Sequence, residues 1–198
     1  MRGLPHLNNM EKSDVKIGII GGGSWATAIA KMLLENVERI NWYMRDRENL
    51  QKFKVLSHNP SYLTMVQFDT DRLFLNCDIN KVVEKSDILI LAIPSPYLKP
   101  ALKKLKVPLK DKIVFSAIKG IVPDENMIIG EYINQVFQVP IENIGVITGP
   151  CHAEEVAMER LSYLTVACQN RETARTMAQM LASHYIKTNI SDDIYGTE

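Results

Sequence analysis

The sequence predicts an α/β fold that is built on a doubly wound, mainly parallel β-sheet. Short segments that are apolar almost throughout alternate along the chain with segments whose apolar residues recur at helical spacing. The first apolar segment also runs directly into a glycine-rich turn. Apolar strands separated by helices are typical of a parallel sheet that is covered by helices on both faces.

The first predicted strand and the first predicted helix flank the glycine turn. Residues 15–20 form an apolar run that we expect to be a buried parallel strand. Residues 25–34 suit a helix, because their apolar side chains fall three and four positions apart on one face. That face holds Ala26, Ile29, Ala30 and Leu33.

The same alternation continues along the rest of the chain. We expect further strands at residues 40–44, 73–75, 87–93, 112–117, 143–148, 163–167 and 185–190. We expect further helices at residues 47–54, 81–85, 97–105, 127–137, 153–158 and 172–183. Residues 57–70 are polar and contain Asn59-Pro60, which predicts a loop. Pro94 and Pro96 are expected to break the strand that precedes them.

The expected organisation is a flexible leader at residues 1–14, followed by one domain at residues 15–198. The leader is polar and lacks the continuous apolar core of a signal peptide. Residues 194–198 suggest no closing element, so the ending resembles a cut, with a disordered natural C-terminus as the alternative.

Composition excludes several classes of protein. The chain has 198 residues, a hydrophobic fraction of 46% and a formal net charge of zero, which gives no support to binding of nucleic acid or of a membrane surface through charge. No apolar run approaches the roughly 18 residues of a membrane span. The three cysteines, Cys77, Cys151 and Cys168, lack metal-like spacing, so we expect no metal site and a reducing, cytoplasmic setting.

The glycine turn carries the most specific signal. Gly21, Gly23 and Ala26 fill the three small-residue positions of the Rossmann dinucleotide-binding fingerprint. In that fingerprint the first glycine allows the tight turn and the second lets the backbone approach a pyrophosphate. The third small residue lets the helix pack close to the strand. The phosphates then lie on free N–H groups at the helix N-terminus.

The end of the second predicted strand bears on which cofactor is bound. An NAD site usually has an acidic residue about 20 residues after the glycines, to hold the ribose 2′-hydroxyl. Met44 occupies that position here, and Arg45 follows it. A guanidinium suits a 2′-phosphate, which favours NADP, while Asp46 leaves NAD open. The alternative interpretation of these charges is a solvated turn.

Other strand ends hold residues that could carry chemistry. Lys119 could hold an anionic substrate or polarise a carbonyl, although a lysine in this position is often only solvated. His152 could be a general base by residue type, with helix capping as the alternative. Cys151 lies at a predicted helix start, where a thiol can have a lowered pKa. Glu154 and Glu155 are expected to be structural, because acids in a first helical turn favour the helix dipole.

Four segments, taken in order, resemble the bacterial-type NAD(P)-dependent glycerol-3-phosphate dehydrogenases. Residues 21–28 (GGGSWATA) are similar to the G-A-G-S-W-G-T-A of that family, and residues 92–95 (AIPS) to its A-V-P-S. Residues 116–121 (SAIKGI) are similar to S-A-x-K-G-I, and residues 149–157 (GPCHAEEVA) to G-P-S/T-x-A-x-E-V-A. The order and spacing fit from about residue 15 to residue 198.

The resemblance implies a Rossmann-type cofactor domain and a role for particular residues. It implies hydride transfer between NAD(P)H and dihydroxyacetone phosphate, giving sn-glycerol 3-phosphate for phospholipid synthesis, and it leaves a homodimer open. The implied cofactor contacts are Ser24, Trp25, Arg45, Ser95 (on the nicotinamide side), Lys119 and Ala153, in addition to Gly21 and Gly23. The implied substrate contacts are Lys119, Gly149 and Cys151.

The chain departs from the family pattern in two places. Cys151 stands where the family has serine or threonine, and a thiol is a weaker hydrogen-bond donor than a hydroxyl. In the family, G-x-E leads to a helix whose A-x-K-N lysine is the general acid/base, followed by a helical substrate domain. Here Gly196-Thr197-Glu198 comes last. The resemblance therefore implies a cofactor domain that is inactive alone, with no catalytic residue except the assisting Lys119.

Two other functions stay open at this point. Another two-domain dehydrogenase, of the hydroxyacid or 6-phosphogluconate type, would share the fold and the glycine turn. The segments around Lys119-Gly120 and Gly149-Pro150 favour glycerol 3-phosphate over those substrates. A module that senses NAD(P) without catalysis is the second alternative, and substrate-dependent cofactor oxidation by the longer parent protein would exclude it.

Overall fold

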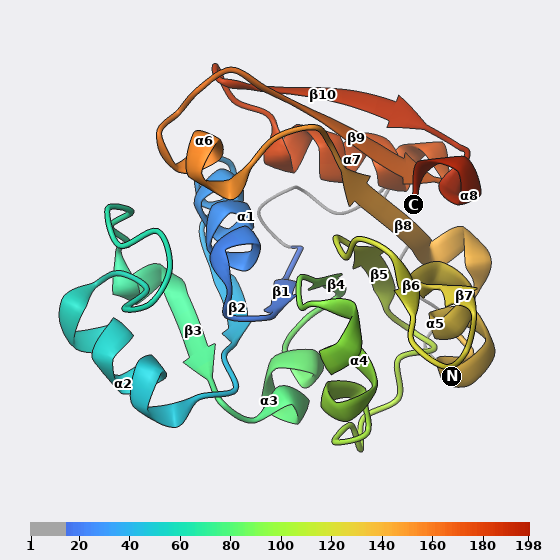
Figure 1. The fold of residues 1–198 in the computed structure, drawn as a ribbon, viewed down its shortest axis with the longest axis horizontal. Helices are drawn as coiled ribbons and strands as arrows, with labels where there is room; N and C mark the ends of the chain where they lie inside the picture. Colours follow the sequence, from blue (N-terminus) through green and yellow to red (C-terminus); the bar gives the residue numbers. More distant parts are fainter. Residues whose placement is uncertain (1–14) are drawn as a thin grey trace.

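The computed structural model describes residues 15–198 (Figure 1). The leader predicted at residues 1–14 lies outside the described residues. One large sheet contains β1 (Ile17–Ile20), β2 (Ile40–Tyr43), β3 (Leu73–Asn76), β4 (Ile88–Leu91), β5 (Ile113–Ser116), β8 (Ile144–Thr148), β9 (Ser162–Cys168) and β10 (Ile186–Ser191). Two short strands, β6 (Ile121–Val122) and β7 (Met127–Ile128), form a separate antiparallel hairpin.

Helices and short 3₁₀ turns connect the strands. The helices are α1 (Ser24–Leu34), α2 (Arg47–Leu56), α3 (Ile79–Glu84), α4 (Ser95–Leu102), α5 (Ile129–Phe137), α6 (Ala153–Ala157), α7 (Arg171–Leu181) and α8 (Ile194–Thr197). The 3₁₀ turns are η2 (Thr70–Arg72) and η3 (Ile141–Asn143). Each predicted strand and helix overlaps an observed element of the same type. Between residues 15 and 198, no helix combines the length and the apolar character that a bilayer crossing requires.

The order of the strands reverses direction at β1. Across the large sheet the order is β10-β9-β8-β5-β4-β1-β2-β3. The chain therefore builds outward from β1 through β2 and β3 on one side, and then returns to add β4 on the other side, parallel to β1. Loops that leave β1 and β4 at their carboxyl ends diverge to opposite faces. Such a point opens a crevice that doubly wound proteins use for ligands.

Side chains on the central strands alternate between two helical layers. Ile17 and Ile19 of β1 belong to a buried cluster that includes α1 and α7, and Ile20 belongs to a second cluster that includes α3, α4 and α5. In Figure 1, α1 lies on one side of the row of strands, and α3 and α4 lie on the other. Burial on both faces explains why β1 and β4 are apolar at almost every position.

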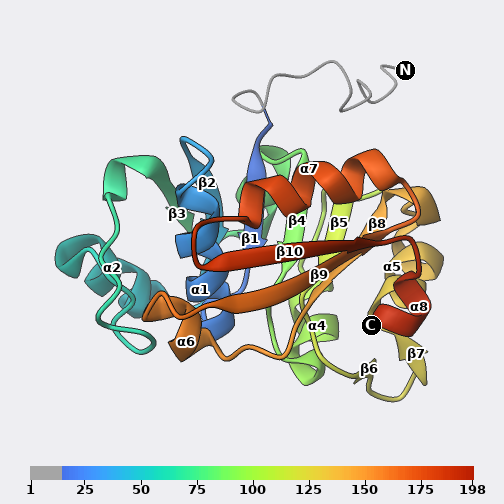
Figure 2. The ribbon, with the colours of Figure 1, turned by 90° about the horizontal axis from the view of Figure 1, so that it is seen from above.

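The predicted doubly wound, mainly parallel sheet is confirmed, with β9 as the exception to parallel pairing. β9 pairs antiparallel with β8, with Thr148 opposite Thr165, and β10, which lies beside β9 in Figure 2, runs parallel to β9. If β9 were parallel to β8, the connection between them would have to run back along the full length of the strands, usually as a complete helix. The connection from β8 holds only the five residues of α6, which packs against α1, so the chain re-enters the sheet from the end at which it left.

The start of α4 differs from the prediction, which placed the helix at residues 97–105. The helix begins at Ser95, directly after Pro94, and includes Pro96 in its first turn. A proline there costs little, because the N–H groups of a first turn have no partner within the helix. Pro96 therefore belongs to the first turn of a helix, and the strand before it ends ahead of Pro94, as expected.

Two further segments were predicted wrongly. Met127 and Ile128 were expected to open a helix, but they form β7, because Asp124 and Asn126 adopt positive φ angles and turn the chain back onto β6. Asp and Asn tolerate this conformation better than most residues. Residues 194–198 were expected to lack a closing element. They contain α8 instead, whose Ile194 is buried against Val146 and Ala167.

Burial of Cys168 gives the stability of the fold a defined dependence on pH. Cys168 is fully buried at the end of β9, and burial raises its pKa to about 11. The folded chain therefore holds this proton more tightly than the unfolded chain, so the free energy of unfolding falls as the pH rises from about 9 to about 11. The loss amounts to about 2 kcal/mol.

The pH effect of Cys168 is measured by urea unfolding between pH 8 and pH 11. Burial also raises the pKa of Tyr185, to about 12, so some loss above pH 10 comes from that residue. The variant Cys168→Ala isolates the thiol, and its stability is expected to fall less steeply over this range than that of the wild type. Identical slopes for the two proteins would contradict this account.

Candidate functional site

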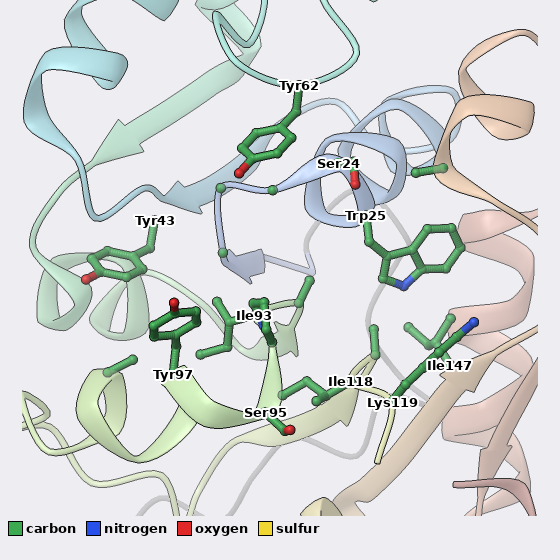
Figure 3. Close-up of a pocket in the computed structure, with 18 of the residues that line it drawn as sticks. Ser24, Trp25, Tyr43, Tyr62, Ile93, Ser95, Tyr97, Ile118, Lys119 and Ile147 are labelled. Carbon is green, nitrogen blue, oxygen red and sulfur yellow. The ribbon is translucent and has the colours of Figure 1, made fainter. Parts of the chain in front are cut away.

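A pocket of about 800 Å³ lies at the carboxyl ends of the central strands. Its walls come from the segments that follow β1, β2, β4, β5 and β8, so it occupies the crevice at the point where the strand order reverses. Figure 3 shows Trp25 and Lys119 toward one end of this pocket and Tyr43 and Tyr97 toward the other.

All ten residues that the sequence suggested for cofactor or substrate binding line this pocket. They come from five separate segments, and the longest distance between them in sequence is more than 130 residues, between the glycine turn and the segment after β8. They are Gly21, Gly23, Ser24, Trp25, Arg45, Ser95, Lys119, Gly149, Cys151 and Ala153. The structure therefore brings together what the sequence placed apart, and the role of each residue stays a prediction.

Gly21 and Gly23 are glycines for different physical reasons. Gly21 has a φ angle of +145°, and a Cβ there would overlap the carbonyl oxygen of Ala92. Gly23 has an ordinary φ of −87°, and a Cβ there would meet no atom within 4 Å. Gly21 is therefore required by the fold itself, whereas the space in front of Gly23 is open toward the pocket.

The carbonyl groups of the glycine turn all accept hydrogen bonds from the protein. The Trp42 indole N–H donates to the Gly21 oxygen at 2.6 Å, and the Asn59 amide donates to the Gly22 oxygen at 3.1 Å. The Thr27 hydroxyl donates to the Gly23 oxygen at 2.9 Å. The N–H groups of Gly22, Gly23 and Ser24 have no hydrogen-bond partner among residues 15–198. The turn therefore offers unused donors at the beginning of an eleven-residue helix.

The end of β2 forms the other part of the pocket. Met44 is buried and holds the position where an NAD site would carry its acid, and the Arg45 guanidinium lies 5.6 Å from the centre of the Tyr97 ring. The Asp46 carboxylate accepts a hydrogen bond from the Asn49 N–H at 3.0 Å and caps α2. This capping role explains the presence of an aspartate at position 46 without a bound ligand.

The segment after β8 forms another wall of the pocket. A Cβ at Gly149 would overlap the carbonyl oxygen of Tyr163, so the close approach of β8 and β9 excludes a side chain at that position. Burial raises the pKa of the Cys151 thiol, and the nearby Lys119 ammonium opposes this only in part. The lowered pKa that a helix start suggested for Cys151 is therefore wrong, because burial of the thiol is the largest influence on its pKa.

His152 and Glu155 have a structural role at the beginning of α6. His152 is the N-cap residue, and its backbone N–H donates to the Glu155 carboxylate at 2.9 Å. This is the reciprocal half of a capping box. The interaction agrees with the structural interpretation of Glu155, while Glu154 lines the pocket. It uses only the backbone N–H of His152.

Sequence reasoning missed several residues of the site. The pocket also holds Tyr43, Tyr62, Tyr97, Lys104 and Glu198. Tyr43 and Tyr97 directly border segments already identified as strand ends, and that position is a signal that could have found them. Tyr62 lies in the loop after α2, and Figure 3 shows its hydroxyl pointing toward the glycine turn. Glu198 directly follows α8, which was not predicted, and its carboxylate accepts a hydrogen bond from the Gly130 N–H at 2.9 Å.

Comparison with known proteins identifies the family. The family model described as the NAD-dependent glycerol-3-phosphate dehydrogenase N-terminus matches residues 16–174 of the sequence. The chain belongs to this glycerol-3-phosphate dehydrogenase family. The resemblance drawn from the four sequence segments is thereby confirmed, and the chain corresponds to the N-terminal NAD(P)-binding domain of these dehydrogenases.

Relatives within the family are longer than this chain. The glycerol-3-phosphate dehydrogenase [NAD(P)+] of Syntrophotalea carbinolica is 30% identical over 186 residues, which cover 93% of this chain and 56% of that protein. The corresponding enzyme of Limosilactobacillus reuteri is 27% identical over 190 residues, covering 92% and 55%. The chain thus spans somewhat more than half the length of these curated glycerol-3-phosphate dehydrogenases.

Solved structures of glycerol-3-phosphate dehydrogenases share the fold. The Plasmodium falciparum protein has a TM-score of 0.83 at 23% identity, over 98% of this chain and 56% of that chain. The Coxiella burnetii protein has a TM-score of 0.81 at 21% identity, over 94% and 56%. These similarities support the Rossmann-type α/β architecture of residues 15–198.

Alanine substitutions at the two glycines are expected to differ in their effect on stability. Gly21→Ala is expected to lower the free energy of unfolding by about 3 kcal/mol or more, because the new Cβ meets the Ala92 carbonyl in a strained backbone conformation. Gly23→Ala is expected to change it by no more than about 0.5 kcal/mol, because the Cβ enters open space. Urea unfolding measures both, and equal stabilities of the two variants would contradict the geometry of the turn.

Proposed function

We propose that this chain is the cofactor domain of an enzyme that interconverts dihydroxyacetone phosphate and sn-glycerol 3-phosphate with NAD(P)H. The product would serve glycerophospholipid synthesis. The observation that carries the proposal is the glycine turn, whose carbonyls all accept hydrogen bonds from the protein, and whose Gly22, Gly23 and Ser24 line the pocket with N–H groups that have no partner among residues 15–198. Family membership supports the substrate and the reaction.

The residues of the turn fit a dinucleotide pyrophosphate. Free N–H groups at a helix N-terminus are suited to anions, since the donors and the helix dipole both favour negative charge. A phosphate must also approach the backbone closely, and the open space at Gly23 permits this. The first turn of α1 carries no acidic residue that would repel an anion.

The end of the pocket at Arg45 and Tyr97 fits an adenosine that carries a 2′-phosphate, so we propose that NADP is preferred over NAD. Arg45 provides a guanidinium that can bind a phosphate with two parallel hydrogen bonds. Tyr97, which lies beneath Arg45, holds the guanidinium in position through a cation–π contact. The apolar Met44 offers no acceptor for a ribose 2′-hydroxyl, and the Asp46 carboxylate is engaged as a helix cap.

The segments after β5 and β8 fit the substrate end. When bound, the nicotinamide ring supplies the hydride. Lys119 would place its positive charge beside the carbonyl oxygen that gains negative charge, and Ser95 and Ala153 would border the nicotinamide. Cys151 stays a neutral thiol near pH 7, because burial raises its pKa, and it can donate a weak hydrogen bond beside Gly149.

We further propose that turnover requires more of the protein than these 198 residues. The chain spans 56% of the length of the Syntrophotalea carbinolica relative, and the family resemblance implies that the general acid/base lysine and the phosphate-binding residues come from the remaining part. Sustained oxidation of NADPH by this chain with dihydroxyacetone phosphate would contradict this point while leaving cofactor binding intact.

Gly23→Ala tests whether the turn binds a dinucleotide. The added methyl group enters the space where the phosphates would lie, so we expect NADPH binding to weaken by about tenfold or more while the variant stays folded. Isothermal titration calorimetry of the wild type and the variant measures this, with thermal melting as the control for folding. Wild-type protein that binds neither NADPH nor NADH would overturn the cofactor assignment.

Arg45→Ala tests the preference for NADP. The wild type is expected to bind NADPH more tightly than NADH, and the variant is expected to lose about tenfold in affinity for NADPH but little for NADH. Arg47→Ala is the matched control, since Arg47 lies two positions away and is not part of the pocket lining. Equal losses for both cofactors in Arg45→Ala would remove its 2′-phosphate role.

A further inference from the structure

Asn59 lies in the loop between α2 and η2, yet its side chain is almost completely buried, with 1% exposure. The two hydrogens of its amide reach different groups of the glycine turn. One bond goes to the Gly22 oxygen at 3.1 Å, and the other goes to the Thr27 hydroxyl at 2.8 Å. That hydroxyl in turn donates to the Gly23 oxygen at 2.9 Å. The Asn59 amide therefore holds two consecutive carbonyls, that of Gly22 directly and that of Gly23 through the Thr27 hydroxyl.

Anchoring a carbonyl also fixes the N–H group of the next residue. In a trans peptide the C=O and the following N–H lie in one plane and point in opposite directions, and none of the peptide bonds in residues 15–198 is cis. The bond from Asn59 to the Gly22 oxygen thus sets the direction of the Gly23 N–H. Through Thr27 it also sets the direction of the Ser24 N–H. These are two of the three donors without a partner in residues that line the pocket.

The loop that carries Asn59 is itself held firmly. The Asn59 side-chain oxygen accepts from the Ser61 N–H at 3.1 Å, which fixes the orientation of the amide. Further along the loop, the Phe68 ring packs against Trp42 with ring centres 5.7 Å apart. At the end of the loop, the Arg72 guanidinium donates to the Leu34 and Val37 carbonyls after α1. The position of Asn59 is therefore determined by the body of the fold.

We propose that Asn59 is a positioning residue for cofactor binding, which aims the Gly23 and Ser24 N–H groups at the pyrophosphate through the Gly22 carbonyl and Thr27. The inference rests on the proposed function, because it assigns a pyrophosphate to the glycine turn. Glycine has the greatest backbone freedom of any residue, so three glycines in a row need outside anchors to hold their donors in one orientation. Asn59 provides the anchor that comes from a distant loop.

The test compares Asn59→Asp with the wild type, using two ligands. The substituted side chain has nearly the same shape, but an ionised carboxylate has no hydrogen to donate and repels the Gly22 oxygen. We expect the affinity for NADPH to fall by about tenfold or more, as misaligned donors lose hydrogen bonds to charged phosphates. Adenosine 2′-monophosphate lacks the pyrophosphate, and its affinity is expected to stay within about twofold of the wild-type value.

The control variant is Asn36→Asp. The Asn36 amide also donates two hydrogen bonds to main-chain carbonyls, those of Met180 and Ala182, but far from the pocket. It is expected to bind both ligands as the wild type does. Thr27→Val provides a second test that does not depend on the folding of Asn59→Asp, since it removes the relay hydroxyl. Thr27→Ser keeps the hydroxyl and is expected to restore NADPH binding.

Each outcome of these titrations decides one question. Loss of NADPH affinity with unchanged binding of adenosine 2′-monophosphate supports the positioning role. Equal losses for both ligands would overturn it, because they indicate general damage to the site. Unchanged NADPH affinity in both Asn59→Asp and Thr27→Val would overturn it as well. Wild-type protein that binds neither NADPH nor NADH would instead overturn the proposed function, and this inference with it.

Discussion

The direction of each peptide group in the glycine turn is the constraint on which the site depends. In a trans peptide the carbonyl and the N–H point in opposite directions. The groups that bind the carbonyls of the turn therefore set the direction of its N–H groups. Here the anchors come from three different parts of the chain: Trp42 on β2, Asn59 in the loop after α2, and Thr27 on α1. The turn is flexible by composition and is ordered by its neighbours.

The second requirement is an open crevice beside the turn, and the order of the strands in the sheet provides it. Parallel strands deliver their carboxyl ends to one edge, and the reversal of strand order at β1 opens that edge between β1 and β4. The reversed direction of β9 adds a wall to the same edge, since the connection after β8 stays there and contributes Gly149, Cys151 and Ala153. One exception to parallel pairing thus contributes three residues to the lining of the pocket.

Features that depend on neighbouring residues were largely predictable from the sequence. The apolar runs of β1, β4 and β5 reflect burial on both faces, and the fingerprint at Gly21, Gly23 and Ala26 reflects the local needs of a turn that enters a helix. Because the ends of parallel strands meet at one edge, residues that follow five different strands line one pocket, and the fingerprint together with the family resemblance selected ten of them. The roles of these residues still await measurement.

Features that depend on distant partners were not predictable in this way. Nothing in the segment around Asn59 indicates that its amide reaches Gly22, which is 37 positions away, because the pairing exists only after β2 and the loop are in place. The direction of β9 depends on how α6 packs against α1, and the helical conformation of Pro96 depends on its place within a first turn. Local sequence patterns specify helices and strands, while tertiary packing determines the direction of a strand and the partners of a side chain.

The construction of the pocket from five strand ends links ligand binding to the folding of the whole domain. Segments that are far apart in sequence must all be in place before the pocket exists, and such long-range pairing forms slowly during folding. A molecule that binds here has no corresponding site on the unfolded chain. Its binding free energy therefore adds to the stability of the entire sheet by mass action, instead of ordering a single loop. Occupancy of the pocket would protect the central strands from opening and from proteolysis together.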